Sequence, residues 1–478
     1  MAQTPLKPAS EAPLILYDQL ASYQGLLRLV LTVFGSSEWA VRILSALAGA
    51  AAVPATYQLG RIVLPRGPAI FAALLLCLSP LHITYSQEGA AYAIGSLLAP
   101  VFLMTAAKLS REVRFGTLLV TMLAGALMGM TFIYLLVFVL AVLGLQALAP
   151  ATLRSRMAIL AGMGGALALC LPILLLYLSR TGSAASPPTE IGLWTKSYAI
   201  RLANSLVSGP LNETHGALFM ADYYVPAVAP DAGVFSTAAG WLGLGALLGF
   251  VPLCAIILAK RDRVMRVWLI ATGGYVSFLI LQSLATQQAE VRYLVPLLPV
   301  TMVMFASIAS VLGLFGRTIG RAVIVGLLVN FLVVMRSDPP GRKWKPDARS
   351  VAGQIIKESG RPAEMKVVVP ELFEVPLFEF YLRNSHYQVL RQPAYEQYFY
   401  QARRDLLHRT PDQLKEEMEW FEQAVRGNKT ASAVYIISQR DKKRAREIAG
   451  LLQPEWIMVG NSETDAILVL KLVKKPGP

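Results

Sequence analysis

Residues 39–92 have the sequence WAVRILSALAGAAAVPATYQLGRIVLPRGPAIFAALLLCLSPLHITYSQEGAAY, and this stretch determines the kind of fold that the chain adopts. It contains two apolar runs, separated by the short basic turn from Arg61 to Arg66. Each run is about long enough to cross a bilayer, which takes roughly 20 residues. The second run ends in a polar cluster that consists of Ser79, Pro80, His82, Tyr85, Ser86, Gln87 and Glu88. A carboxylate is costly to place at the mouth of a membrane span, so Glu88 indicates a functional site.

The composition extends the membrane interpretation to most of the chain. Of the 478 residues, 55% are hydrophobic and 15% are charged, and the mean hydropathy is +0.51. Soluble proteins are nearer a quarter charged, so the composition predicts a polytopic membrane protein. The net charge of +14 is explained by Lys and Arg in cytoplasmic loops, and no nucleic-acid partner is expected. The cysteines, Cys77, Cys170 and Cys254, lie inside apolar runs and indicate neither a disulfide nor a metal site.

The apolar runs predict about ten transmembrane helices, at residues 40–63, 68–86, 90–109, 115–131, 134–149, 157–179, 234–259, 265–284, 292–314 and 319–336. The run from 115 to 150 is expected to form a short helical pair that turns between Thr131 and Tyr134. Lys and Arg gather in every second loop, which the positive-inside rule makes cytoplasmic. The turn at Glu88, the loop 180–233, the turn 287–290 and the chain after Arg336 are therefore expected outside.

Three segments are expected along the chain. Residues 1–38 form an extracytoplasmic segment in which Leu26–Phe34 is an interfacial helix, and residues 39–336 form the transmembrane domain. The aromatic loop 180–233 is either a plain connector or a mobile cover for a lipid-linked substrate. Residues 337–478 alternate helical and strand-like patterns, which predicts a soluble α/β domain. Its expected helices are 348–359, 406–425 and 442–452, and its expected strands are 366–370, 433–438, 456–459 and 466–472.

Two segments carry a resemblance to a known family. The first runs from Arg42 through Leu59-Gly60-Arg61 to Leu78-Ser79-Pro80-x-His82-x-x-Tyr85-Ser86-Gln87-Glu88, and the second is EVRYLVPLLP at 290–299. Both resemble the bacterial relatives of the dolichyl-phosphate-mannose protein mannosyltransferases, in the C-type glycosyltransferase superfamily. That superfamily also includes the aminoarabinose transferases that modify lipid A. The resemblance extends over residues 24–337, with a weaker match at 344–356.

The resemblance implies transfer of one sugar from a polyprenyl phosphate to a lipid, protein or glycan hydroxyl, at the outer face of the membrane. Phosphate is a good leaving group, so the site needs a carboxylate base for the acceptor and cations for the departing phosphate. Glu88 is the expected base, and Arg292 and Arg42 are expected to hold the phosphate together with Tyr293. Gln87, Tyr85 and Tyr92 are the expected substrate-binding residues.

Each assignment has a plainer alternative. Glu88 can cap the N-terminus of the next span, where the helix dipole favours a carboxylate. The arginines can extend to lipid headgroups, and the tyrosines can serve as interface anchors. His82 is expected to bond helix-end carbonyls and is not assigned to the site.

The chain departs from the family pattern in two places, and the second, the first outer loop, separates an enzyme from an inactive relative that binds lipid-linked glycan or a partner protein. The family commonly has Ala-Arg after Ser-Gln-Glu, whereas here Gly89-Ala90-Ala91 follows Glu88. The family also begins with one further span and an outer loop whose Asp is the usual base; here Asp18 and Glu11 are the acids of that region. Asp18 is therefore a weak second candidate for the base. An upstream start that adds this span and loop is the favoured explanation.

The remaining expectations concern partners and place. The donor is a polyprenyl-phosphate-sugar, the acceptor is a lipid, protein or glycan, and membrane lipids surround the helices. No cofactor and no divalent metal are indicated by the sequence. The expected location is the bacterial inner membrane, with the site and the C-terminal domain on the extracytoplasmic side.

Overall fold

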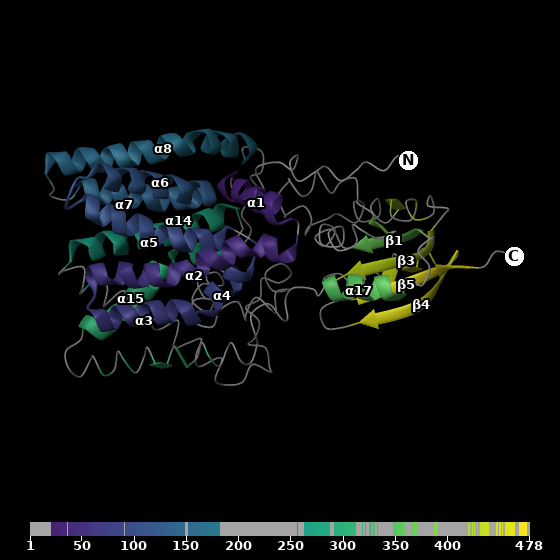
Figure 1. Ribbon diagram of the computed structural model, residues 1–478. Helices are drawn as coiled ribbons and strands as arrows, with labels where there is room; N and C mark the ends of the chain where they lie inside the picture. The colour runs from purple at the N-terminus through teal and green to yellow at the C-terminus, as the bar shows by residue number, and fades with distance from the viewer. Residues whose placement is uncertain are drawn as a thin grey trace. The chain divides into compact units, whose positions relative to one another are not determined.

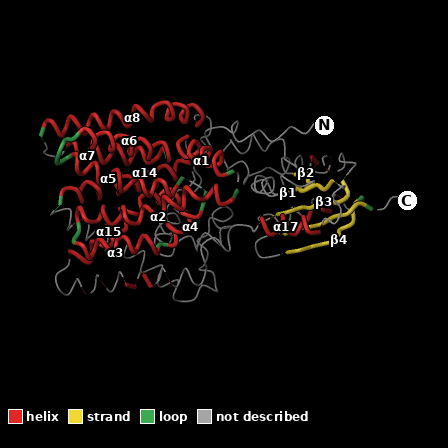
Figure 2. Tube along the Cα trace, in the orientation of Figure 1, coloured by secondary structure: helices red, strands yellow, loops and turns green. Residues whose placement is uncertain are grey.

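The computed structural model describes residues 21–35, 37–89, 91–148, 152–181, 262–286, 291–311, 348–358, 365–370, 387–389, 431–438, 455–463 and 468–475, with some single positions and pairs between 256 and 452. The chain divides into two compact units whose main boundary lies between Pro340 and Gly341. The first unit is a bundle of helices and the second contains a β-sheet (Figures 1 and 2). The predicted fold class, a helical membrane domain with a C-terminal α/β domain, is confirmed.

The helical unit, called the membrane unit below, follows the predicted spans closely. Its elements are α1 (Ala21–Phe34), α2 (Glu38–Val63), α3 (Arg66–Leu78), α4 (Pro80–Gln87), α5 (Tyr92–Leu109), α6 (Phe115–Thr131), α7 (Ile133–Leu148), α8 (Leu153–Thr181), α14 (Arg263–Thr286), the 3-10 helix η2 (Val291–Leu297) and α15 (Leu298–Val311). Within the described residues, three segments are long and apolar enough to cross a membrane alone, at Trp39–Val63, Tyr92–Leu109 and Leu153–Leu175. The predicted spans 234–259 and 319–336 lie wholly or mostly outside the described residues, so the total of about ten stays a prediction.

Two of the predicted spans are more irregular than the sequence suggested. The predicted span 68–86 consists of two helices, α3 and α4, which bend by 53° at Ser79. Proline cannot donate the amide that would continue α3, and it is tolerated at the first turn of the next helix, so Pro80 explains the break. The predicted span 292–314 begins as the 3-10 helix η2, with Pro296 inside it, before α15 follows.

The predicted helical pair within 115–150 is confirmed. Helix α6 ends at Thr131 and α7 begins at Ile133, and Phe132 between them has extended backbone angles (φ −145°, ψ 116°). The amide of Phe132 donates to the Met128 carbonyl (2.9 Å), and the Leu135 amide donates to the Phe132 carbonyl (2.9 Å). The break therefore leaves these backbone groups hydrogen-bonded, as an apolar surrounding requires.

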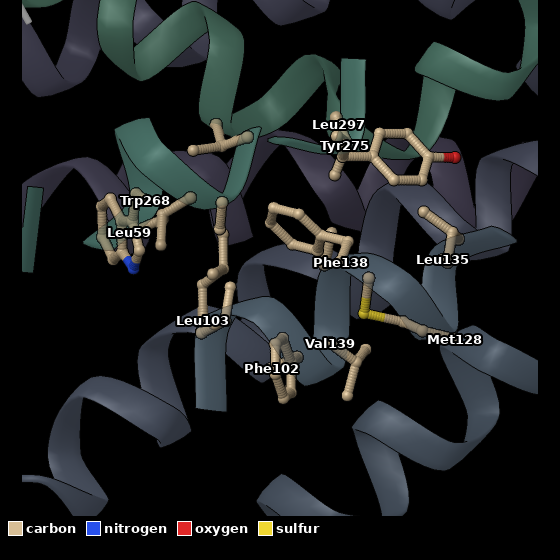
Figure 3. Close-up of a cluster of buried hydrophobic side chains, with 14 of the residues drawn as sticks. Leu59, Phe102, Leu103, Met128, Leu135, Phe138, Val139, Trp268, Tyr275 and Leu297 are labelled. Carbon is tan, nitrogen blue, oxygen red and sulfur yellow. The ribbon is translucent and has the colours of Figure 1, made fainter. Parts of the chain in front are cut away.

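One aliphatic and aromatic core joins the helices of the membrane unit (Figure 3). Among the described elements, α2 to α8, α14, α15 and η2 all contribute side chains to it; Figure 3 labels Leu59, Phe102, Leu103, Met128, Leu135, Phe138, Val139, Trp268, Tyr275 and Leu297. Helix α5 is central, because it packs against α2, α6 and η2. The core thus fixes the ends of these elements relative to one another, and the candidate site lies at those ends.

Helix α1 includes the predicted interfacial helix and starts earlier, at Ala21. It packs against α2 and α6. Leu29 and Val33 are exposed, whereas Tyr23 is buried. A helix of 14 residues is about 21 Å long and too short to span the membrane alone. Its place at the interface stays a prediction.

The second unit is built on a five-stranded mixed sheet of order β2-β1-β3-β5-β4, whose strands are labelled between Figures 1 and 2. Its elements are α17 (Ala348–Glu358), β1 (Met365–Pro370), β2 (Tyr387–Val389), β3 (Ala431–Ser438), β4 (Trp456–Glu463) and β5 (Leu468–Lys474). Strand β1 is parallel to β2 and β3, whereas β5 is antiparallel to β3 and β4. The predicted helix 348–359 and the four predicted strands are found, and β2 was not predicted. The described positions of the helices expected at 406–425 and 442–452 are helical.

Candidate functional site

The polar end of the second span is the short helix α4, and local sequence fixes where it begins. Ser79 is its N-cap, and the Ser79 hydroxyl accepts a hydrogen bond from the His82 amide (3.4 Å). Serine is a favoured N-cap residue and Pro80 suits the first helical position. The helix ends after Gln87, and Glu88 is its C-cap with extended backbone angles. Glu88 thus lies in the turn that joins α4 to α5, and its side chain is half-buried.

Helix α4 is fixed to α2 at very close range. The His82 ring nitrogen Nε2 lies 3.1 Å from the carbonyl oxygen of Gly49, and Ser86 donates to the His82 carbonyl at 2.6 Å. A Cβ on Gly49 would lie 2.6 Å from the Ser86 Cβ, so glycine is required for this approach. His82 therefore bonds a helix carbonyl, as predicted, although the carbonyl lies in the middle of α2 rather than at a helix end.

The turn after α4 also packs against the start of α2. A Cβ on Gly89 would lie 2.5 Å from Val41 Cγ1 and 3.2 Å from the Val41 carbonyl oxygen. Glu88 precedes Gly89 and Arg42 follows Val41, so the predicted base and one predicted phosphate ligand flank the same contact. Arg42 is exposed on α2. The site where the family commonly has alanine thus has no room for a Cβ in this chain.

The second motif forms η2, which α5 holds from the side. The Ser96 hydroxyl donates to the Val295 carbonyl at 2.7 Å, and both groups are buried. A Cβ on Gly95 would lie 2.8 Å from Pro296 Cγ, so glycine again permits the close approach. The Tyr275 hydroxyl of α14 donates to the Tyr293 carbonyl at 3.1 Å. The backbone that carries Arg292 is therefore fixed by two neighbouring helices.

A continuous series of rings joins the two motifs. The ring centroids of Tyr85 and Tyr92 are 5.0 Å apart, those of Tyr92 and Phe132 are 4.9 Å apart, and those of Phe132 and Tyr293 are 5.3 Å apart. Tyr134 extends the series, with its ring 5.2 Å from that of Tyr293. These five residues are called the aromatic bridge below. They come from α4, α5, the α6–α7 break, α7 and η2.

The aromatic bridge brings three predicted site residues, Tyr85, Tyr92 and Tyr293, into one cluster. Their side chains are 4%, 1% and 5% exposed, so in this conformation their rings contact other rings rather than open space. Gln87 is exposed beside them on α4. The role of these residues in binding substrate stays a prediction, and the structure adds that they support the segments that carry Glu88 and Arg292.

Some predicted residues lie beyond what the structure describes. Asp18 lies outside the described residues, and for Arg292 only the backbone position in η2 is described. Across the described ranges, no three side chains of His, Cys, Asp or Glu gather to form a metal site. The expectation that the protein needs no metal or cofactor stays a prediction.

Sequence reasoning missed two parts of this arrangement. Phe132 and Tyr134 fall within the predicted turn of the 115–150 pair, but their contact with η2 joins residues far apart in the sequence. Gly49 and Gly95 each lie inside a helix, where glycine is unfavourable by about 1 kcal/mol relative to alanine. Glycines inside these helices are a sequence signal of close helix packing, and this signal could have indicated the contacts.

Comparisons with known proteins concern the family resemblance and the fold. Residues 23–176 match the family model described as dolichyl-phosphate-mannose-protein mannosyltransferase. No curated protein sequence matches the chain. Among solved structures, the chain is similar to apo ArnT from Cupriavidus metallidurans, with a TM-score of 0.54 and 14% identity over 96% of this chain and 88% of that one. It is less similar to the archaeal oligosaccharyltransferase AglB from Archaeoglobus fulgidus, with a TM-score of 0.46 and 14% identity over 90% of this chain and 63% of that one.

These comparisons confirm the family resemblance and the fold. The family match runs from α1 into α8 and contains the whole Ser79–Tyr92 segment. At 14% identity, the similarity to apo ArnT shows the fold alone. The family match ends before Arg292. The assignment of the second motif to the site is therefore supported by its own sequence and by its contact with the first motif.

Proposed function

We propose that this protein is a membrane glycosyltransferase that moves a sugar from a polyprenyl-phosphate carrier to a hydroxyl group of a lipid, protein or glycan. One observation carries the proposal. The two motif segments, 79–92 and 290–299, are about 200 residues apart in sequence and meet at one end of the helix bundle through the aromatic bridge. The family match over 23–176 and the ArnT-like fold support the same conclusion.

The chemistry divides between the two segments. Glu88 lies in the α4–α5 turn and accepts the proton of the acceptor hydroxyl as that oxygen attacks the anomeric carbon. The bond from this carbon to the phosphate oxygen then breaks, and the polyprenyl phosphate leaves as an anion. Arg292, at the start of η2, and Arg42, near the start of α2, stabilise the phosphate charge. Asp18 is a second candidate for the base.

The proposal also includes a side and a compartment. Arg61 and Arg66 flank the α2–α3 turn, and Arg111 and Arg114 lie in the α5–α6 turn, at the opposite ends of these helices from Glu88. The positive-inside rule places such basic turns in the cytoplasm. The site therefore faces the outside of a bacterial inner membrane, where lipid-linked sugars are consumed. The experiment proposed in the next paragraph would identify the sugar and the acceptor.

The test is complementation of a deletion strain, followed by mass spectrometry of lipid-linked and cell-envelope glycans. The parent should contain a glycan that the deletion strain lacks, with its carrier-linked precursor accumulating in the deletion strain. Glu88→Gln keeps the shape of the side chain and removes its charge, and Arg292→Lys keeps the charge and removes the planar fork. Each should lower product by about 10²-fold, the scale of general-base and oxyanion-type contributions, at unchanged membrane abundance.

Two matched variants serve as controls. Glu112 and Arg114 form an exposed ion pair at 2.6 Å in the α5–α6 turn, away from the site. Glu112→Gln and Arg114→Lys repeat the same chemical changes there and should leave the product unchanged, because exposed ion pairs contribute little. Full product from the Glu88→Gln protein would remove this residue from the mechanism. Identical glycans in the parent and the deletion strain would favour the alternative, an inactive relative that binds lipid-linked glycan.

A further inference from the structure

We propose that Phe132 is a positioning residue for the transfer reaction. It holds the α4–α5 turn, which carries Glu88, and the start of η2, which carries Arg292, in one fixed arrangement. This inference rests on the proposed function for its catalytic meaning. Its structural part, the coupling of the two segments, is measurable without any activity.

Phe132 is the ring through which the two motifs make contact in the aromatic bridge. Its side chain is 0% exposed, and its ring centroid lies 4.9 Å from that of Tyr92 and 5.3 Å from that of Tyr293. Such edge and tilted pairs contribute about 0.5–1.5 kcal/mol each beyond the area that they bury. On one side, Tyr92 continues to Tyr85, three residues before Glu88. On the other side, Tyr293 directly follows Arg292.

Other contacts also restrain η2, and they differ in the end of η2 that they reach. Ser96 and Gly95 of α5 contact Val295 and Pro296, in the second half of η2. Phe132 instead contacts the ring of Tyr293, which lies at the end where Arg292 is found. The contacts from α5 restrain the second half of η2, whereas the Tyr293 end is restrained by Phe132 together with the Tyr134 ring and the Tyr275 hydroxyl. Among these three residues, Phe132 is the one whose ring also contacts Tyr92 of the first motif, in addition to the direct contact between α4 and η2.

The break between α6 and α7 places the Phe132 ring inside the apolar layer of the membrane, where the ring can pack between helix ends. Helices of 17 and 16 residues are each about 25 Å long, and Arg114 and Arg154 lie next to their far ends. The apolar layer is roughly 30 Å thick, so the turn at Phe132 lies inside the layer rather than beyond it. At this depth the apolar ring of Phe132 packs between helix ends. A polar side chain in the same turn would instead extend toward water.

The structural part is tested by hydrogen–deuterium exchange on the purified full chain in detergent. Phe132→Met keeps an apolar side chain of similar size and removes both ring contacts. Exchange should rise about tenfold in both segments, 85–92 and 291–297, as expected when two aromatic pairs are lost. The matched control is Phe102→Met, since Phe102 is also 0% exposed but lies in the α5 core against Gly125. A rise in only one segment, or the same rise in both variants, would overturn the coupling.

The catalytic part is tested by a double-mutant cycle in the complemented deletion strain. A misplaced base or phosphate ligand can reduce a rate by 10²-fold, so Phe132→Met should lower product by about tenfold. In the Glu88→Gln background the same change should lower product less than about twofold, because the alignment it disturbs has already lost its base. A merely structural defect would instead lower membrane abundance and multiply with Glu88→Gln. Coupled exchange without any glycan product would contradict the proposed function and leave the coupling established.

Discussion

The contacts that stabilise the interior of the membrane unit differ in kind from those inside the C-terminal α/β unit. In the membrane unit, neighbouring helices approach at glycine, as at Gly49 and Gly95, and side chains donate to backbone carbonyls of other elements, as at Ser96. In the α/β unit, apolar strand side chains form the core: residues 433–437 of β3 are all buried, and in β5 buried residues alternate with less buried ones. The buried residues of β5 are Leu468, Leu470 and Leu472.

The difference follows from the two solvents. Lipid tails are as apolar as leucine, so helices in a bilayer gain little by burying apolar side chains against each other. Close van der Waals packing and interhelical hydrogen bonds associate them instead. A sheet in water is stabilised mainly by removing apolar area from the solvent, at about 25 cal/mol per Å². The damaging change should therefore be a lost methyl group in the α/β unit and an added one in the membrane unit.

The largest expected effect is on the α/β unit, for Leu470→Ala. Leu470 is 1% exposed on β5, which lies between β3 and β4 in the sheet. Such a truncation removes buried area and leaves a cavity, so the free energy of unfolding should fall by about 2–5 kcal/mol. Pulse proteolysis of the C-terminal unit in urea, on the full chain in detergent, measures this. The control, Ile457→Ala on β4, alters a side chain that is 45% exposed and should change stability by less than about 0.5 kcal/mol. Equal effects would show that burial does not dominate this unit.

The next effect is on the membrane unit, where adding one methyl group at Gly49 should destabilise. The new Cβ would overlap Ser86, so α4 must move away from α2. Overpacking of this kind costs about 1–3 kcal/mol. Gly144→Ala in α7 is the matched control, because no atom outside its own helix backbone lies within 4 Å of the added Cβ. That substitution should stabilise by about 0.4–1 kcal/mol, through the unfolded state. The midpoint temperature of thermal unfolding in detergent should therefore fall for Gly49→Ala and rise for Gly144→Ala.

A swap sharpens the Gly49 test. In the double variant Gly49→Ala with Ser86→Gly, the Cβ moves from one helix to the other and the nearest remaining atom, Ser86 Cα, lies 3.6 Å away. This is an ordinary contact distance, so the swap should recover most of the stability that Gly49→Ala loses. Continued instability of the swap would mean that the hydroxyl of Ser86, which donates to the His82 carbonyl, is itself required.

The sequence predicted the elements better than the contacts between them. Apolar length and the position of the Arg61–Arg66 turn predicted α2, the α3–α4 span and α5 to within a few residues, but not the break before Pro80. Short apolar runs predicted β3 and β5, which are buried at successive residues in β3 (433–437) and on one side in β5. Strand β2 has only three residues, too few to show a period, and it was missed.

The sequence indicated candidate site residues one by one but not their arrangement, and their roles stay predictions. Family resemblance indicated Glu88, Tyr85, Tyr92, Tyr293 and Arg292 separately, since each lies within a recognisable motif. The ring that joins these motifs belongs to neither of them, because Phe132 reaches its place through the break between α6 and α7. Contacts of this kind depend on helix packing, which a single sequence does not specify.

The smallest expected effect on stability is that of Ser96→Ala, which removes the hydrogen bond from α5 to the Val295 carbonyl (2.7 Å). In water-soluble cores an unsatisfied carbonyl costs about 1–3 kcal/mol. Between membrane helices the average contribution is only about 0.6 kcal/mol, because the unfolded chain in a bilayer also finds partners. The membrane value should apply here, and thermal unfolding in detergent would measure it. Ser110→Ala is the control, since the Ser110 hydroxyl donates to Ala107 of its own helix end (2.8 Å). If Ser96→Ala costs 2 kcal/mol or more, η2 lies in an environment more like a soluble core than a bilayer. The contrast between the two units would then stop at this end of the bundle.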